Sequence, residues 1–177
     1  MIETHRLTIR RFLPEDWKDL YAYLSDPRVV LYEPYGVFTA EECKSEAVRR
    51  SNNDAFWAVC LKEDKKLIGN IYLSMQGFDT WELGYVFNSS YQGKGYATES
   101  TKAVVDYAIR ECAARRVIAK CNPDNDKSWK LLERLNMRRE GHLKQNIYFK
   151  TDHNNHPIWQ DTYEYALLSS EWKMTSD

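Results

Sequence analysis

The sequence has little of the two residues that most often interrupt regular structure, with 7 glycines and 5 prolines among 177 residues. Collagen-like and low-complexity disordered chains are rich in one or both, so the composition excludes these classes. The longest apolar runs are short, such as residues 57–61, whereas a membrane helix needs about 20 apolar residues. Residues 1–6 lack the apolar core of a signal peptide. We therefore expect no membrane partner.

Neither sign of charge dominates, because 25 Lys and Arg residues face 26 Asp and Glu residues and leave a formal net charge of -1. A dedicated nucleic-acid-binding domain is usually strongly basic, so we expect no nucleic-acid partner. The sequence also lacks a Cys-x-x-Cys pair and a His-Glu-x-x-His motif. We therefore expect no metal site and, for the 4 cysteines, free thiols in a reducing cytoplasm.

The residues that are present fit a single globular domain over residues 1–177. Alternation and short apolar runs predict strands over residues 6–12, 55–62, 66–74, 81–87, 116–121, 143–150 and 157–168. Helical spacing predicts helices over residues 14–25, 96–113 and 125–136. A capping box formed by Thr39 and Glu42 predicts a further helix that extends to about Ser51. The order β-α-α-β-β-β-α-β-α-β-β is typical of an α+β fold. Short connections between the three middle strands predict an antiparallel meander.

A glycine-bearing loop connects the predicted strand 81–87 to the predicted helix 96–113, and its sequence is Gln92-Gly93-Lys94-Gly95-Tyr96-Ala97-Thr98. Glycines at such a turn allow successive backbone N–H groups to point toward one place, and the helix N-terminus adds partial positive charge. The loop is therefore a candidate site for a pyrophosphate, with the Lys94 charge at its rim.

Two common phosphate motifs do not fit this loop. A Walker A loop needs Ser or Thr after Gly93-Lys94, where this sequence has Gly95. A Rossmann loop needs a third glycine at the position of Thr98. A surface turn with a helix cap stays open as the simpler interpretation. The third candidate is the pattern Gln/Arg-x-x-Gly-x-Gly/Ala, which Gln92, Gly95 and Ala97 match.

This pattern and two further segments resemble the GNAT superfamily of N-acyltransferases, most closely its RimJ/RimL-like branch, which acetylates the N-terminal residue of ribosomal proteins. The segments are ETHRLTIRRFLPEDWKDLY, WELGYVFNSSYQGKGYATES and NPDNDKSWKLLERLNM, and the likeness spans about residues 3–168. The resemblance implies a mixed, mostly antiparallel sheet of roughly six to seven strands flanked by about four helices. It also implies acetyl-coenzyme A as cosubstrate, without a metal.

The resemblance places the cosubstrate in a V-shaped gap between two neighbouring strands. The backbone of the segment at the end of strand 81–87 would pair with the pantetheine arm, the loop amides would hold the pyrophosphate, and Asn125 would bond a pantetheine amide. The implied binding residues are Tyr85, Val86, Phe87, Gln92, Gly93, Lys94, Gly95, Tyr96, Ala97, Thr98 and Asn125. Ordinary sheet core for residues 85–87 and a helix cap for Asn125 are the alternatives.

Transfer of an acetyl group from a thioester requires a neutral amine, for which a carboxylate acting through water is a suitable base. Glu82 is the candidate base, because it lies just before the pantetheine segment on the same strand face as Gly84. An exposed carboxylate or a salt bridge is its alternative. The family's usual tyrosine, seven residues after Asn125, is replaced by Leu132. Ser128, three residues after Asn125, is the candidate that assists the departing thiolate in the RimL-like branch; a plain first-turn residue is the alternative.

These residues predict a cytoplasmic acetyl-coenzyme A-dependent N-acetyltransferase whose acceptor is a primary amine, first of all a protein N-terminal α-amino group. Acetylation of a polyamine or aminoglycoside and a non-catalytic coenzyme A-binding module are the alternatives. A homodimer is possible, since dimers are common in the resembled branch. The aromatic residues between the first two helices, Tyr32, Tyr35 and Phe38, are candidates for the acceptor wall or for core packing. At Asn136, where the family usually has glycine, we expect left-handed backbone.

Overall fold

A computed structural model describes residues 1–173 of the chain. Over these residues the strands are β1 (Ile2–Glu3), β2 (Leu7–Arg11), β3 (Phe56–Leu61), β4 (Leu67–Gly77), β5 (Thr80–Phe87), β6 (Arg116–Cys121), β7 (Arg138–Thr151) and β8 (Pro157–Leu168). The α-helices are α1 (Trp17–Leu24), α2 (Ala40–Ser51), α3 (Tyr96–Arg110) and α4 (Asp126–Arg134). The predicted α+β order is confirmed.

All the strands belong to one sheet, in the order β1-β2-β3-β4-β5-β6-β8-β7. Neighbours are antiparallel except β5 and β6, so the predicted meander of β3, β4 and β5 is confirmed. Eight strands replace the roughly six to seven that we predicted. The additional strand, β1, pairs with β2 at Ile2 opposite Ile9 and has 2 residues, too few to show an alternating pattern.

Several predicted element boundaries differ from the structure; for example, β4 continues to Gly77 instead of residue 74, and α1 begins at Trp17 instead of residue 14. Two further differences have a clear cause. Strand β7 begins at Arg138 instead of residue 143, because it is an edge strand whose residues are almost all exposed and carry no apolar alternation. Helix α3 ends at Arg110 instead of residue 113, because the chain reverses at Ala113, whose φ is 53°. Asn136 adopts the expected left-handed backbone, with a φ of 58°.

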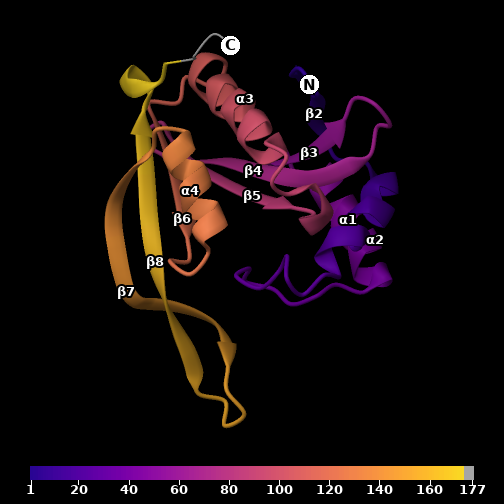
Figure 1. The fold of residues 1–177 in the computed structure, drawn as a ribbon, viewed down its shortest axis with the longest axis vertical. Coiled ribbons are helices and arrows are strands. Elements are labelled where there is room, and N and C mark those ends of the chain that lie inside the picture. Colours follow the sequence, from indigo (N-terminus) through magenta and orange to yellow (C-terminus); the bar gives the residue numbers. More distant parts are fainter. Residues whose placement is uncertain (174–177) are drawn as a thin grey trace.

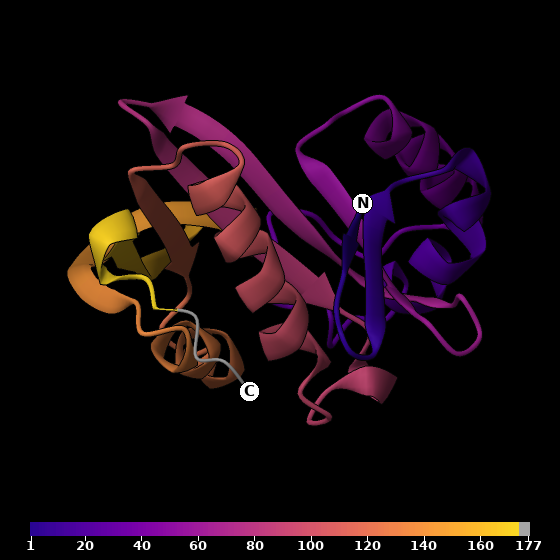
Figure 2. The ribbon, with the colours of Figure 1, turned by 90° about the horizontal axis from the view of Figure 1, so that it is seen from above.

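The helices cover both faces of the sheet and define two separate cores. Apolar residues of α3 and α4 pack with Leu83 and Phe87 on one face. Those of α1 and α2 pack with Val86 on the other. Helix α3 lies between α4 and the N-terminal strands (Figure 2). The β7–β8 hairpin extends well beyond the other elements (Figure 1). Strand β5 therefore separates two layers and contributes side chains to each.

The structure can be compared with the predictions of free cysteines and of no membrane-spanning helix. All four cysteines are free, as predicted, and Cys43 and Cys60 are buried. Among the helices of residues 1–173, none combines the length and the apolar character needed to cross a bilayer.

Candidate active site

Strands β5 and β6 pair at one end and diverge at the other. Their parallel register runs from Thr80 opposite Arg116 to Leu83 opposite Ala119 and then stops. On its other edge, β5 stays paired with β4 as far as Phe87. Within the described chain, the β6-facing edge of β5 over residues 84–86 thus has no strand partner. Such an edge offers backbone donors and acceptors to an extended ligand, which is how β-augmentation works.

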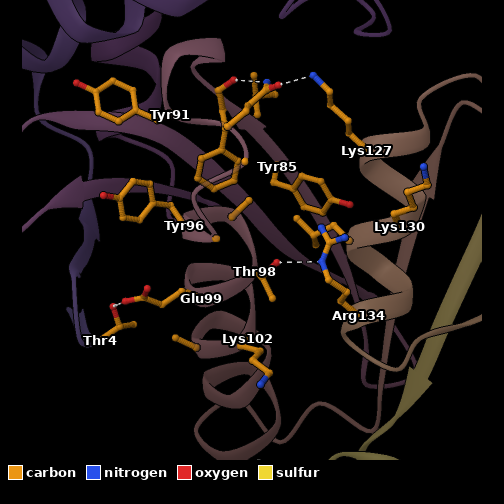
Figure 3. A pocket seen from close by; sticks show the side chains of 18 of the residues that line it. Thr4, Tyr85, Tyr91, Tyr96, Thr98, Glu99, Lys102, Lys127, Lys130 and Arg134 are labelled. Carbon is orange, nitrogen blue, oxygen red and sulfur yellow. Dashed lines mark hydrogen bonds between the residues drawn. The ribbon is translucent and has the colours of Figure 1, made fainter. Parts of the chain in front are cut away.

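A cavity of about 1920 Å³ opens at this divergence. Its wall includes the end of β5 at Tyr85, Val86 and Phe87, the loop before α3, and one face of α4 (Figure 3). The structure therefore brings most of the predicted binding residues to one cavity: Tyr85, Val86, Phe87, Gln92, Gly93, Gly95, Tyr96, Ala97, Thr98 and Asn125 line it. Lys94 is in the same loop, with its ammonium 5.2 Å from the Tyr91 ring centroid.

Two glycines shape the loop before α3. Gly93 and Gly95 have φ values of 77° and 82°, in the left-handed region that other L-residues rarely adopt. Gly95 is the N-cap of α3 and gives no side-chain hydrogen bond to the first turn. The first amides of a helix have no intrahelical partner and carry partial positive charge. The amides of residues 96–98, which belong to the loop segment 93–98 of the predicted anion site, are therefore suited to an anion, and the binding role of each residue stays a prediction.

Arg6 supports this loop from the N-terminal segment. Its Nε donates to Glu99 Oε2 at 2.8 Å, and its backbone N–H donates to Glu99 Oε1 at 2.9 Å. Its Nη1 also donates to the carbonyl oxygen of Lys94 at 3.0 Å, and its guanidinium lies 4.4 Å from the Tyr96 ring centroid. Burial acts to raise the pKa of Glu99, but hydrogen bonds from Thr4 and Arg6 outweigh it and lower the pKa. Arg6 thus connects the loop to the first turn of α3.

A basic face of α4 lies opposite the glycine loop. Lys127 Nζ donates to Gln92 Oε1 at 3.0 Å, and Arg134 Nε donates to Thr98 Oγ1 at 3.3 Å (Figure 3). Lys130 lies between them and also lines the cavity. We did not predict these three residues from the sequence, although positions 127, 130 and 134 share a helix face and their helical spacing opposite a predicted anion loop was a usable signal. Their charges suit a phosphate-bearing ligand.

Tyr85 and Ser128 form a hydroxyl pair at the divergence. The Tyr85 hydroxyl donates to the Ser128 carbonyl oxygen at 2.9 Å and lies 3.0 Å from Ser128 Oγ. Burial raises the pKa of Tyr85, against the opposing hydrogen bond with Ser128, so the phenol is protonated at neutral pH. Asn125 is the N-cap of α4 and accepts from the Ser128 N–H at 3.3 Å. Asn125 therefore caps α4 and also lines the cavity.

Glu82 lies apart from these groups. It does not line the cavity, and its Oε1 is 3.7 Å from Lys120 Nζ, with 28% of its side chain exposed. Successive residues of a strand face opposite sides, so Glu82 shares the face of Val86, toward α1 and α2, while Tyr85 faces α3 and α4. The salt bridge that the sequence left open is thus formed, and the role of Glu82 as base stays a prediction.

The aromatic residues between α1 and α2 were candidates for the acceptor wall or for core packing, and they differ in their contacts. Tyr35 and Phe38 pack edge to face, with ring centroids 5.3 Å apart, against the core of α1 and α2. Tyr32 instead donates from its hydroxyl to the carbonyl oxygen of Asp124 at 3.2 Å. Glu33, between them, lines the cavity. Nothing in the local sequence distinguishes Glu33 from other loop carboxylates, so the sequence alone does not predict it.

Comparisons with known proteins agree with this architecture. Residues 6–138 match the family described as Acetyltransferase (GNAT) domain. The uncharacterized N-acetyltransferase YnaD of Bacillus subtilis is 39% identical over 173 residues, which cover 97% of this chain and 98% of YnaD. The [ribosomal protein uS5]-alanine N-acetyltransferase of Escherichia coli is 32% identical over 113 residues, covering 62% of this chain and 55% of that protein.

A solved structure of similar architecture is the GNAT-family acetyltransferase from Bacillus anthracis. It superimposes with a TM-score of 0.87 at 37% identity, covering 96% of this chain and 99% of that one. The overall likeness therefore extends beyond the loop motif to nearly the whole sheet and its helices.

Proposed function

Because this chain belongs to the GNAT family and is an acetyl-coenzyme A-dependent N-acetyltransferase, we propose that it acetylates a primary amine, first of all the α-amino group of a protein N-terminus. The observation that carries the proposal is the divergence of β5 and β6 beside the glycine loop. The likeness to the uS5-alanine enzyme supports a protein acceptor. An α-amino group, with a pKa near 8, also needs less help to become neutral than a lysine near 10.4.

The residues present fit the cosubstrate. The unpaired edge of β5 over residues 84–86 suits the two amides of a pantetheine arm. The amides at the start of α3 and the basic face of Lys127, Lys130 and Arg134 suit its phosphates. Bound there, acetyl-coenzyme A supplies an activated acetyl group as a thioester.

The transfer that we propose is direct attack of the amine, without an acetyl group on the protein. Glu82 accepts a proton from the attacking nitrogen through water, and a backbone N–H near Tyr85 donates to the carbonyl oxygen as negative charge develops. Ser128 donates a hydrogen bond to the departing sulfur. The hydroxyl of Tyr85 donates to the carbonyl oxygen of Ser128 at 2.9 Å, which holds that serine in position and leaves the serine proton for the sulfur.

A turnover screen tests this proposal. We expect thiol release from acetyl-coenzyme A with peptides that begin with alanine or serine, and mass spectrometry should locate the acetyl group on the α-amino nitrogen. Faster turnover with spermidine or an aminoglycoside would replace the protein acceptor by a small amine. Coenzyme A binding without turnover on any acceptor would instead favour a non-catalytic binding module.

We further propose that the enzyme acts in the cytoplasm, where its four free thiols would stay reduced. A homodimer is also proposed. Sedimentation of the purified chain tests the dimer, and a monomer over micromolar concentrations would exclude it.

A further inference from the structure

The segment of residues 26–35, here called the strap, crosses from the end of β5 to the start of α4. At one end, Asp26 Oδ2 accepts from Ser89 Oγ at 2.8 Å, just beyond β5. At the other, the Tyr32 hydroxyl donates to the carbonyl oxygen of Asp124 at 3.2 Å, just before α4. The strap thus bridges the two elements that border the divergence, on the side where α1 and α2 lie.

A third attachment comes from the long hairpin. Lys150 Nζ, on β7, donates to the carbonyl oxygen of Leu31 at 3.4 Å. The strap is therefore held by three separate elements, so a functional group on it has a defined position. Within the strap, the Glu33 N–H donates to the carbonyl oxygen of Val30 at 3.1 Å, which closes a turn. Glu33 then lines the same cavity as Tyr85.

The surroundings of Glu33 leave its carboxylate without an ion pair among the described residues. One cation acts on Glu33 without contacting it: Arg50 of α2 is 2% exposed and donates from Nε to Glu46 at 2.6 Å, while its Nη1 has no hydrogen-bond partner among the described residues. The phenol of Tyr35 hydrogen-bonds to Glu33. Burial raises the pKa of Glu33 to about 7, although Tyr35 and Arg50 act to lower it. The other charged groups along the strap, Arg28 and Lys150, are engaged with Asp26 and the Leu31 carbonyl oxygen.

A half-buried carboxylate without an ion pair, facing a cavity, is costly unless a cation occupies the cavity. The opposite face of the sheet already carries the basic residues that suit phosphates. We propose that Glu33 binds the ammonium group of the acceptor at the strap side of the cavity and takes its first proton. This inference rests on the proposed acetylation of a primary amine, and it adds the residue that recognises the amine.

The proton balance of the reaction is complete with this assignment. Glu33 takes one proton from the ammonium and leaves a neutral amine. The nitrogen lone pair forms the C–N bond, the thioester C–S bond breaks, and its electron pair leaves with sulfur. The second nitrogen proton passes through water to Glu82. One of the two protons returns to the thiolate and the other is released to solvent, giving an amide and coenzyme A thiol.

The test is the pH profile of kcat/KM for the best acceptor among Ala- and Ser-peptides and spermidine. We expect an acid limb with an apparent pKa near 7 in the native enzyme, because kcat/KM reports ionisations of the free enzyme. In Glu33→Gln the limb should move up to the pKa of the acceptor amine, near 8 for an α-amino group, because the amine must then bind already neutral. At pH 7.5 kcat/KM should fall about 10- to 100-fold, mainly through a higher KM for the amine. Glu33→Asp should retain the limb at reduced rate.

The matched control is Glu63→Gln, which changes an exposed carboxylate in the β3–β4 turn and should alter neither quantity. Calorimetry of coenzyme A binding should give the same Kd for all variants. A Glu33→Gln enzyme that keeps the limb at its native position and a kcat/KM within twofold of native would overturn the role of Glu33 and leave the proposed acetylation intact. If no acceptor in the panel is acetylated, the proposed function itself fails, and the inference with it.

Discussion

Gly95→Ala is the sharpest test of the loop as an anion site. Gly95 has a φ of 82°, where an alanine costs roughly 1–2 kcal/mol. Its new Cβ would lie 3.3 Å from Arg6 Nη2, so the guanidinium has to shift by only a few tenths of an ångström. The strain is then chiefly in the backbone, and the free loop can relieve it by rotating its amides away. Binding must restore them, so the Kd for coenzyme A should rise about 5- to 30-fold.

Titration calorimetry with coenzyme A measures this change, and Gly77→Ala is the matched control. Gly77 has a φ of 120°, has no heavy atom within 4 Å of an added Cβ, and ends β4 at the far end of β5 from the loop. It should lower the free energy of unfolding, as any strained turn does, and leave the Kd unchanged. If Gly95→Ala instead destabilises the fold like its control and binds coenzyme A normally, the left-handed turn serves folding alone and the anion-site argument is refuted.

Three further substitutions separate the remaining roles. Arg6→Met removes the side-chain hydrogen bonds to Glu99 and to the Lys94 carbonyl and keeps the backbone one to Glu99. It should raise the Kd for acetyl-coenzyme A about tenfold and leave turnover of acetyl-pantetheine, which lacks the pyrophosphate, unchanged. Glu82→Gln should lower kcat about 10²-fold at pH 7, and the loss should be smaller at high pH, where more of the amine is neutral. A variant with native activity would show that Glu82 only forms the salt bridge with Lys120. Ser128→Ala should lower kcat roughly 10- to 150-fold with an unchanged Kd for coenzyme A. Full activity of this variant would exclude a role for Ser128 in stabilising the thiolate.

The parts of the fold that the sequence predicted best are those with local signals. The capping box of Thr39 and Glu42 marked the start of α2, and the structure contains both of its hydrogen bonds. The buried strands of the meander carried apolar runs. The failures lie where no local signal exists: β7 is an exposed edge strand, and the end of α3 depends on a reversal at Ala113 that brings Ala114 to the carbonyl oxygen of Ala108.

The candidate site divides in the same way. The glycine loop is a short contiguous motif, so its place in the cavity wall could be predicted. Arg6 and Glu99 are 93 residues apart, and nothing in either segment indicates their contact. Glu33 became a candidate only because the strap places it on the cavity wall. The partial burial of its carboxylate depends on where the strap lies in the folded chain, which composition and periodicity do not encode.

Strand β5 explains why one short segment can serve both partners of the reaction. Its residues alternate between the two layers, with Tyr85 toward α3 and α4 and Val86 toward α1 and α2. Residues 80–83 of β5 pair with β4 on one edge and with β6 on the other. From residue 84 onward, β5 pairs with β4 alone among the strands of residues 1–173, and its other edge is unpaired. In the reaction that we propose, a donor held by the glycine loop and an amine held at the strap meet at this opening from opposite faces. Direct attack of that amine would take much of its acceleration from positioning, and it would need no acetyl carrier on the protein.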